Sequence, residues 1–93
     1  GYLMKSIHVR ITGRVQGVWY RAWTCQQADI KGLSGWVRNR RDGSVEAVFS
    51  GDDADVDAML ALCREGPHLA VVDALALEPC DPTEDGFKSL PTA

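Results

Sequence analysis

Between a predicted strand and a predicted helix, the chain reads Gly13-Arg14-Val15-Gln16-Gly17-Val18-Trp19-Tyr20-Arg21. Before this stretch, apolar residues alternate with polar ones at Ile7, Val9 and Ile11, which is the pattern of a half-buried strand over residues 5–12. After it, residues 20–31 can form a helix that stops at Gly32. A glycine-bracketed turn from a strand into a helix leaves main-chain N–H groups unpaired, and the helix dipole adds partial positive charge there. The stretch therefore predicts an anion-binding loop, with the Arg21 guanidinium folded back over the anion.

The composition is that of one soluble domain, which we place over residues 1–93. Hydrophobic residues make up 45% of the chain, enough for a single core, and the net charge of −3 argues against a nucleic-acid partner. No apolar run suits a membrane partner, and an odd number of cysteines (Cys25, Cys63 and Cys80) cannot form a closed disulfide set. We therefore expect a cytoplasmic protein with free thiols. Residues 1–3 precede Met4, and we expect them to be foreign to the natural chain.

A β-hairpin follows the first helix, with strands over residues 34–41 and 44–50. Asp42-Gly43 is typical of a two-residue turn that matches the twist of paired strands. On the second strand Val45, Ala47 and Phe49 share one face. On the first strand Asn39 follows Val37 on the same face, so we expect Asn39 near the turn end of its strand.

A second helix is predicted over residues 51–65, because Val56, Met59, Leu60 and Cys63 repeat at helical spacing. A strand over residues 70–78, a loop over 79–86 and a short edge strand over 86–88 complete the chain. The order strand, helix, strand, strand, helix, strand predicts an α+β, ferredoxin-like βαββαβ sandwich. We expect an antiparallel sheet with two helices on one face, and the first and third strands side by side in its centre.

The aspartates at the start of the second helix imitate a calcium loop only in part. Asp53, Asp55 and Asp57 have the right spacing, but Ala58 stands where the sixth position needs glycine and Arg64 where the twelfth needs glutamate. Helix capping explains these aspartates better. Nor do His, Cys and carboxylate residues have zinc spacing, so we expect no metal and no cofactor.

The aromatic residues raise the alternative of RNA binding, because the ferredoxin-like sheet is also that of the RNA-recognition module. Trp19, Tyr20, Trp23 and Trp36 have rings that stack on bases. However, the aromatic and glycine pattern that the module places on its strands is missing here. We therefore interpret Tyr20 and Trp36 as packing residues.

Two motifs together resemble the acylphosphatase family. They are residues 13–21, quoted above, and Gly35-Trp36-Val37-Arg38-Asn39-Arg40-Arg41-Asp42-Gly43-Ser44-Val45-Glu46, within a likeness that runs from about residue 5 to residue 88. The resemblance implies hydrolysis of the carboxyl–phosphate bond of acyl phosphates without a metal. It implies that Arg21 binds the phosphoryl group and that Asn39 positions the attacking water. Tyr20 stands where phenylalanine is common, a change we expect to matter little, and Lys31 stands where many members have leucine.

The residues themselves suit this chemistry. The N–H groups of Val15, Gln16, Gly17, Val18, Trp19 and Tyr20 can form a cradle for phosphoryl oxygens, with a bidentate arginine beside it. The leaving carboxylate has a conjugate acid with a pKa of about 4, so it departs without a general acid. We expect a monomer that acts on small acyl phosphates such as acetyl, carbamoyl or bisphosphoglycerate-type compounds, with inorganic phosphate or sulfate as product or analogue. The alternative is a non-catalytic regulatory module that binds phosphate or acyl phosphates without turnover.

Overall fold

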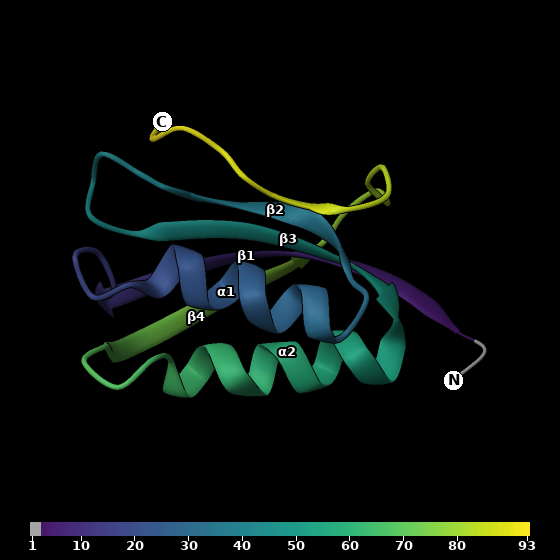
Figure 1. Ribbon diagram of the computed structural model, residues 1–93, viewed down its shortest axis with the longest axis horizontal. Helices are drawn as coiled ribbons and strands as arrows, with labels where there is room; N and C mark the ends of the chain where they lie inside the picture. Colours follow the sequence, from purple (N-terminus) through teal and green to yellow (C-terminus); the bar gives the residue numbers. More distant parts are fainter. Residues whose placement is uncertain (1–2) are drawn as a thin grey trace.

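Both helices cover one face of a five-stranded sheet, as Figure 1 shows. The computed structural model describes residues 3–93, so Gly1 and Tyr2, expected with Leu3 to be foreign residues, lie outside the described part. The elements are β1 (Met4–Arg14), α1 (Tyr20–Ile30), β2 (Ser34–Asn39), β3 (Val45–Asp52), α2 (Asp53–Glu65), β4 (Val71–Pro79) and β5 (Phe87–Ser89). Neither helix in the described residues is long and apolar enough to cross a bilayer.

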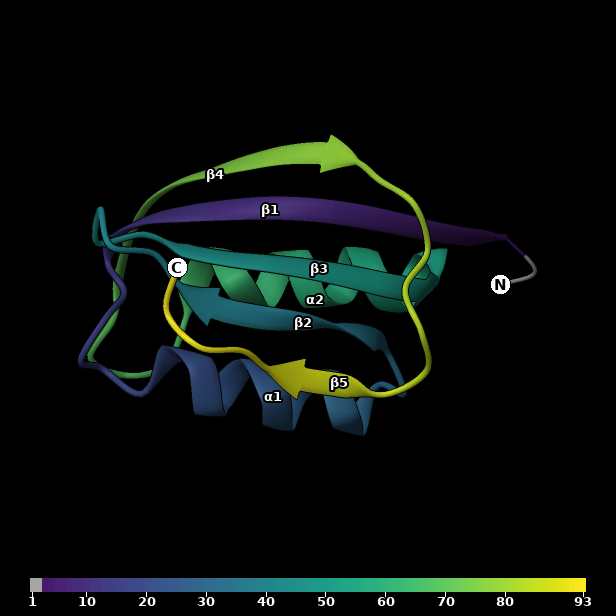
Figure 2. The same ribbon diagram turned by 90° about the horizontal axis from the view of Figure 1, so that it is seen from above.

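The strands lie in the order β4-β1-β3-β2-β5, so the first and third strands are neighbours as the topology predicted (Figure 2). The four strands of the βαββαβ unit pair antiparallel, and β5 adds a parallel pair along β2, which makes the complete sheet mixed. The first strand is longer than the alternation indicated. It continues through Gly13 and Arg14, with a register shift after Thr12 where β1 pairs with β4.

The β2–β3 hairpin turns differently from the expectation. Asn39 pairs with Val45, the Arg40 N–H donates to the Ser44 oxygen at 2.8 Å, and the Gly43 N–H donates to the Arg40 oxygen at 3.1 Å. Gly43 has a φ of 96°, whereas Asp42 does not have positive φ. The connection is therefore a three-residue loop ending in a glycine bulge, and the prediction of a two-residue turn was wrong.

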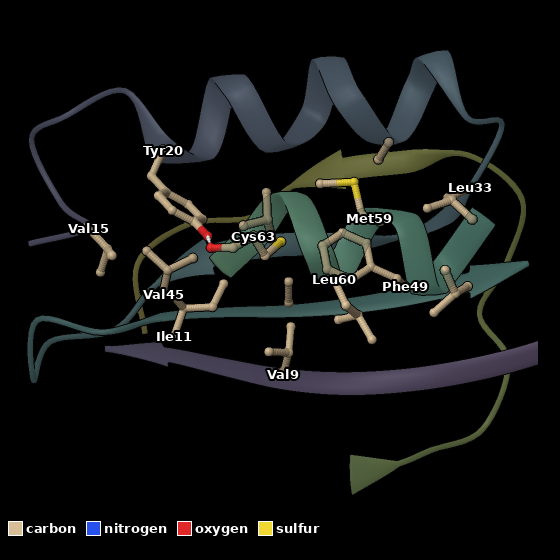
Figure 3. Packing of buried hydrophobic residues seen from close by; sticks show 14 residues of the cluster. Val9, Ile11, Val15, Tyr20, Leu33, Val45, Phe49, Met59, Leu60 and Cys63 are labelled. Atoms are coloured by element: carbon tan, nitrogen blue, oxygen red, sulfur yellow. Dashed lines mark hydrogen bonds between the residues drawn. The ribbon is translucent and has the colours of Figure 1, made fainter. Parts of the chain in front are cut away.

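The core lies between the sheet and the two helices, with Tyr20, Phe49 and Met59 among its largest buried side chains (Figure 3). In α1 the buried residues are Tyr20, Thr24 and Ala28, while Ile30 is 76% exposed. Of the three buried residues only Tyr20 is large and apolar, and Trp23 packs against the core while partly exposed, so α1 lacks a regular apolar stripe.

Helix α2 matches its prediction. Val56, Met59, Leu60 and Cys63 are its buried residues. The side chain of Asp52 accepts a hydrogen bond from the Ala54 N–H at 3.0 Å, and Asp53 and Asp55 lie in the first turn. The expectation holds for the helix start, where Asp52 is the cap and the charges of Asp53 and Asp55 suit the helix dipole. Asp57 lies beyond the first turn and pairs with Lys5 at 2.7 Å instead.

Candidate active site

The loop between β1 and α1, residues 15–19, has an unusual main-chain conformation. Gly17 has a φ of 74° and Trp19 a φ of 70°, and Trp19 is the one non-glycine residue with positive φ among the described residues. The sign of φ therefore alternates from Gln16 to Tyr20, which points successive N–H groups into a common concavity, the arrangement called a nest. A left-handed tryptophan costs about 1–3 kcal/mol, a strain of the kind that clusters at functional sites.

The N–H groups of this loop have no main-chain acceptor in the described part of the chain. Within residues 3–93, no hydrogen bond outside the helices and strands uses an N–H from residues 15–19 as its donor. Among the residues that the structure describes, helix α1 also has no side-chain cap hydrogen bond at Trp19 and no acidic residue in its first turn. Free amides and the positive end of the helix dipole therefore coincide, and such a site favours an anion.

A pocket of about 400 Å³ opens beside this loop. It is lined by Val15, Gln16, Gly17, Trp19, Tyr20, Arg21, Ala22, Asn39 and Ser89, which come from the loop, the start of α1, the end of β2 and β5. The structure thus brings together Arg21, Asn39 and every expected cradle residue except Val18. Val18 instead packs against the core. Sequence reasoning did not include Ala22 and Ser89.

Arg21 and Asn39 both present unused polar groups. The side chain of Arg21 forms no hydrogen bond or ion pair with another described residue and is partly exposed. The Oδ1 atom of Asn39 is buried, and no residue that the structure describes donates a hydrogen bond to it. Buried polar atoms are nearly always paired, so an orphaned acceptor in a pocket indicates a partner that comes from outside the chain.

The main chain around Asn39 is firmly held, although its side chain is unpaired. Asn39 pairs with Val45 on β3, and its carbonyl accepts a hydrogen bond from the Ala93 N–H at 3.0 Å. The last residues of the chain therefore run alongside the end of β2, at the end of the sheet that carries the loop (Figure 2). This support fixes the direction in which the Asn39 side chain leaves the strand.

Gln16 has a role that the sequence did not reveal. Its Nε2 atom donates to the main-chain oxygens of Arg40 and Ser44, both at 2.7 Å. The side chain therefore ties the loop to the β2–β3 hairpin, whose strand β2 carries Asn39. A glutamine in a glycine-rich loop gives no periodic signal, so only the folded chain shows this contact.

A family model for acylphosphatase matches residues 7–89. The chain belongs to the acylphosphatase family. The acylphosphatase of Rhodospirillum rubrum is 54% identical over 90 residues, covering 96% of this chain and 99% of that protein. The acylphosphatase of Haloarcula marismortui is 54% identical over 82 residues, covering 87% and 90%. The solved acylphosphatase of Coxiella burnetii superposes with a TM-score of 0.89 at 31% identity, covering 94% and 93%.

These relatives make acylphosphatase activity the function of the chain, so the alternative of a non-catalytic binding module is not retained. In this acylphosphatase the Tyr20 hydroxyl donates to the main-chain oxygen of Cys63 at 2.6 Å, as Figure 3 shows. Burial raises the pKa of the Tyr20 hydroxyl, which stays protonated as a donor. Cys63 lies near the end of α2, where helix carbonyls lack partners, so the hydroxyl links the start of α1 to the end of α2. We expected this hydroxyl to matter little, and the structure gives it a buried partner.

Proposed function

We propose that this acylphosphatase hydrolyses acyl phosphates without a metal, with Arg21 and the loop amides holding the phosphoryl group and Asn39 orienting the water. The observation that carries the proposal is the meeting, in one pocket, of an unpaired guanidinium and an orphaned carboxamide oxygen beside a loop of free N–H groups. Each group lacks a partner within the described chain, and a bound acyl phosphate with one water would supply all of them.

The phosphoryl group would lie in the nest, with its oxygens accepting hydrogen bonds from the N–H groups of residues 15–20. Arg21, in the first turn of α1, would donate two parallel hydrogen bonds. Lysine presents a point charge in place of this fork, so it would not reproduce the geometry. These donors are in place before the substrate arrives, and such preorganised donors stabilise charge that develops in the transition state.

Asn39 would act on the nucleophile. Its Oδ1 atom would accept a hydrogen bond from a water placed in line with the bond to be broken. The water oxygen forms the new P–O bond while the bond from phosphorus to the carboxyl oxygen breaks, and its electron pair leaves with the carboxylate. The water proton passes to a phosphoryl oxygen of the substrate. An amide orients the water without accepting its proton, so no histidine is required.

Metal independence follows from the leaving group. A carboxylate whose conjugate acid has a pKa of about 4 departs without protonation or a Lewis acid. The Arg21 guanidinium and the loop N–H groups would stabilise the negative charge on the phosphoryl oxygens. We also propose a cytoplasmic monomer, a location supported by the three free cysteines, Cys25, Cys63 and Cys80.

The test uses benzoyl phosphate with and without a chelator. We expect full turnover after chelation. Arg21→Ala should lose both turnover and inhibition by inorganic phosphate. Arg21→Lys should lose both almost as completely. Turnover that chelation abolishes would refute metal independence, and an Arg21→Ala variant still inhibited by phosphate at the wild-type concentration would refute the role of Arg21.

A further inference from the structure

The pocket is larger than a phosphoryl group requires. Its volume of about 400 Å³ falls within the range of about 300–1,000 Å³ that holds small organic ligands. If the phosphoryl group occupies the nest and Arg21, the remaining space is where the acyl part of the substrate must lie. The residues that line this remainder therefore decide which acyl groups bind.

Trp19 stands at the rim of this space. It is one of the residues that line the pocket, and 59% of its surface is exposed. Ala22, in the first turn of α1, lines the same pocket. The other two tryptophans have ring partners: Trp23 packs edge-on against Tyr20, and Trp36 lies under the Arg38 guanidinium. Trp19 has no ring contact of this kind among the described residues.

The strained conformation of Trp19 supports a function for its side chain. Asparagine and glycine adopt a left-handed conformation at much lower cost than tryptophan. The nest needs positive φ at this position, but it does not need an indole. A large exposed aromatic ring at a position that disfavours it, beside a ligand pocket, indicates that the ring has a role in binding.

Charge restricts the acyl group further. Arg21 is the one charged residue among the described residues that line the pocket. Because Arg21 would be occupied by the phosphoryl group, a second anionic group on the substrate finds no cation in the lining. An uncharged, flat acyl group instead gains contact with the indole and the Ala22 methyl group.

We propose that Trp19 is a specificity-determining residue that selects uncharged aromatic or other flat apolar acyl phosphates over small or anionic ones. This inference rests on the proposed function, because it assigns the phosphoryl group to Arg21 and the loop. It narrows the substrate class expected from the sequence, since bisphosphoglycerate-type compounds carry a second phosphate and become poor substrates.

The experiment compares kcat/KM for benzoyl phosphate, acetyl phosphate and 4-carboxybenzoyl phosphate. The ratio of two substrates on one sample cancels any loss of folded enzyme. Trp19→Asn keeps a residue that tolerates the left-handed conformation and removes the ring, whereas Trp19→Phe keeps a ring. Trp36→Leu removes an indole from outside the pocket and serves as the matched control.

We expect the wild-type enzyme to prefer benzoyl phosphate to both other substrates. Trp19→Asn should lower the benzoyl-to-acetyl ratio roughly three- to tenfold, while Trp19→Phe keeps most of it and Trp36→Leu leaves it unchanged. Inhibition by inorganic phosphate should change less than about twofold in Trp19→Asn, because the loop amides remain. An unchanged ratio in Trp19→Asn, or equal losses on both substrates, would overturn the inference. Failure of the proposed cradle would appear separately, as intact phosphate inhibition in Arg21→Ala.

Discussion

The side chain of Gln16 donates to the main-chain oxygen of Arg40 at 2.7 Å, across 24 positions of sequence. A second hydrogen bond from the same nitrogen reaches Ser44, also at 2.7 Å. The loop that would hold the phosphoryl group is thereby fixed to the hairpin whose first strand presents Asn39. The distance between the bound phosphorus and the attacking water thus depends on a residue whose side chain would contact neither.

We expect Gln16→Ala to lower kcat on benzoyl phosphate by about tenfold to a hundredfold, because small misplacements of reacting groups are costly. Inhibition by inorganic phosphate should weaken much less, because the loop N–H groups remain. Steady-state kinetics with phosphate as inhibitor measures both quantities. Gln16→Glu places a carboxylate against two carbonyl oxygens and should be at least as damaging. Equal losses of kcat and of phosphate inhibition would show that Gln16 shapes the phosphate-binding loop itself and does not align that loop with Asn39.

Tyr20→Phe should destabilise the protein with little effect on chemistry. Removing the hydroxyl leaves the Cys63 carbonyl buried without its donor, which costs about 1–3 kcal/mol. Urea unfolding should report a lower free energy of unfolding, while kcat on benzoyl phosphate stays within about twofold because the main-chain N–H of residue 20 is retained. Unchanged stability in this variant would mean that the hydroxyl contributes nothing to the link between α1 and α2.

Gly17 and Gly32 form a matched pair for testing the nest. Both have positive φ, 74° and 67°, and a methyl group at either would meet no atom of the described residues within 4 Å. Alanine should therefore cost a similar strain of about 1–2 kcal/mol at each position. We expect only Gly17→Ala to weaken phosphate inhibition, because Gly32 lies at the far end of α1. A comparable weakening in Gly32→Ala would mean that the loss follows from stability and not from the nest.

Glu46 gives the protein a defined response to acid. On the sheet face away from the helices, its carboxylate accepts hydrogen bonds from Arg38 at 2.7 Å and Arg40 at 3.2 Å, and lies 2.6 Å from His8 Nε2. Burial alone would raise the pKa of Glu46, but the hydrogen bonds from His8 and Arg38 outweigh it and the pKa is lowered.

A carboxyl group with a lower pKa in the folded state binds fewer protons there than in the unfolded chain. Glu46 therefore stabilises the fold fully above its unfolded pKa of about 4.3, and this contribution is lost as the pH falls through the lower, folded pKa. We expect the free energy of unfolding to decrease in that acid range, and we expect this decrease to be smaller in Glu46→Gln. Urea unfolding between pH 3 and pH 7 measures the free energy of unfolding of both proteins. An identical pH dependence in Glu46→Gln would exclude this residue as a source.

The hairpin shows where sequence reasoning stopped short. Asp-Gly fits both a two-residue turn and a longer loop with a glycine bulge, and the local pattern does not separate them. The two turn types are separated by which strand residues are buried on the face toward the helices. In the observed register Val37 faces Ala47, which is buried with Val45 and Phe49. A two-residue turn would shift Val37 opposite Val48 and place the Glu46 face toward the helices, so burial of the apolar face selects the longer loop.

The candidate site was predictable in part, because its residues occupy short, recognisable segments. Arg21 and Asn39 were expected together from the motifs, and the structure brings both to the same pocket. Ser89 could not be expected there, because its place depends on how β5 returns along β2 after a loop without periodic pattern. The hydroxyl of Tyr20 was undervalued for a similar reason, since its partner lies 43 positions away on another helix.

Two constants of the Asn39→Ala variant test the mechanism most directly: kcat on benzoyl phosphate and the inhibition constant of inorganic phosphate. Asn39 Oδ1 is a buried acceptor without a donor among residues 3–93, and we assign it to the attacking water. We expect turnover to be abolished while phosphate inhibition stays close to that of the wild-type enzyme. A fully active variant, or one that loses phosphate binding as completely as turnover, would contradict the mechanism.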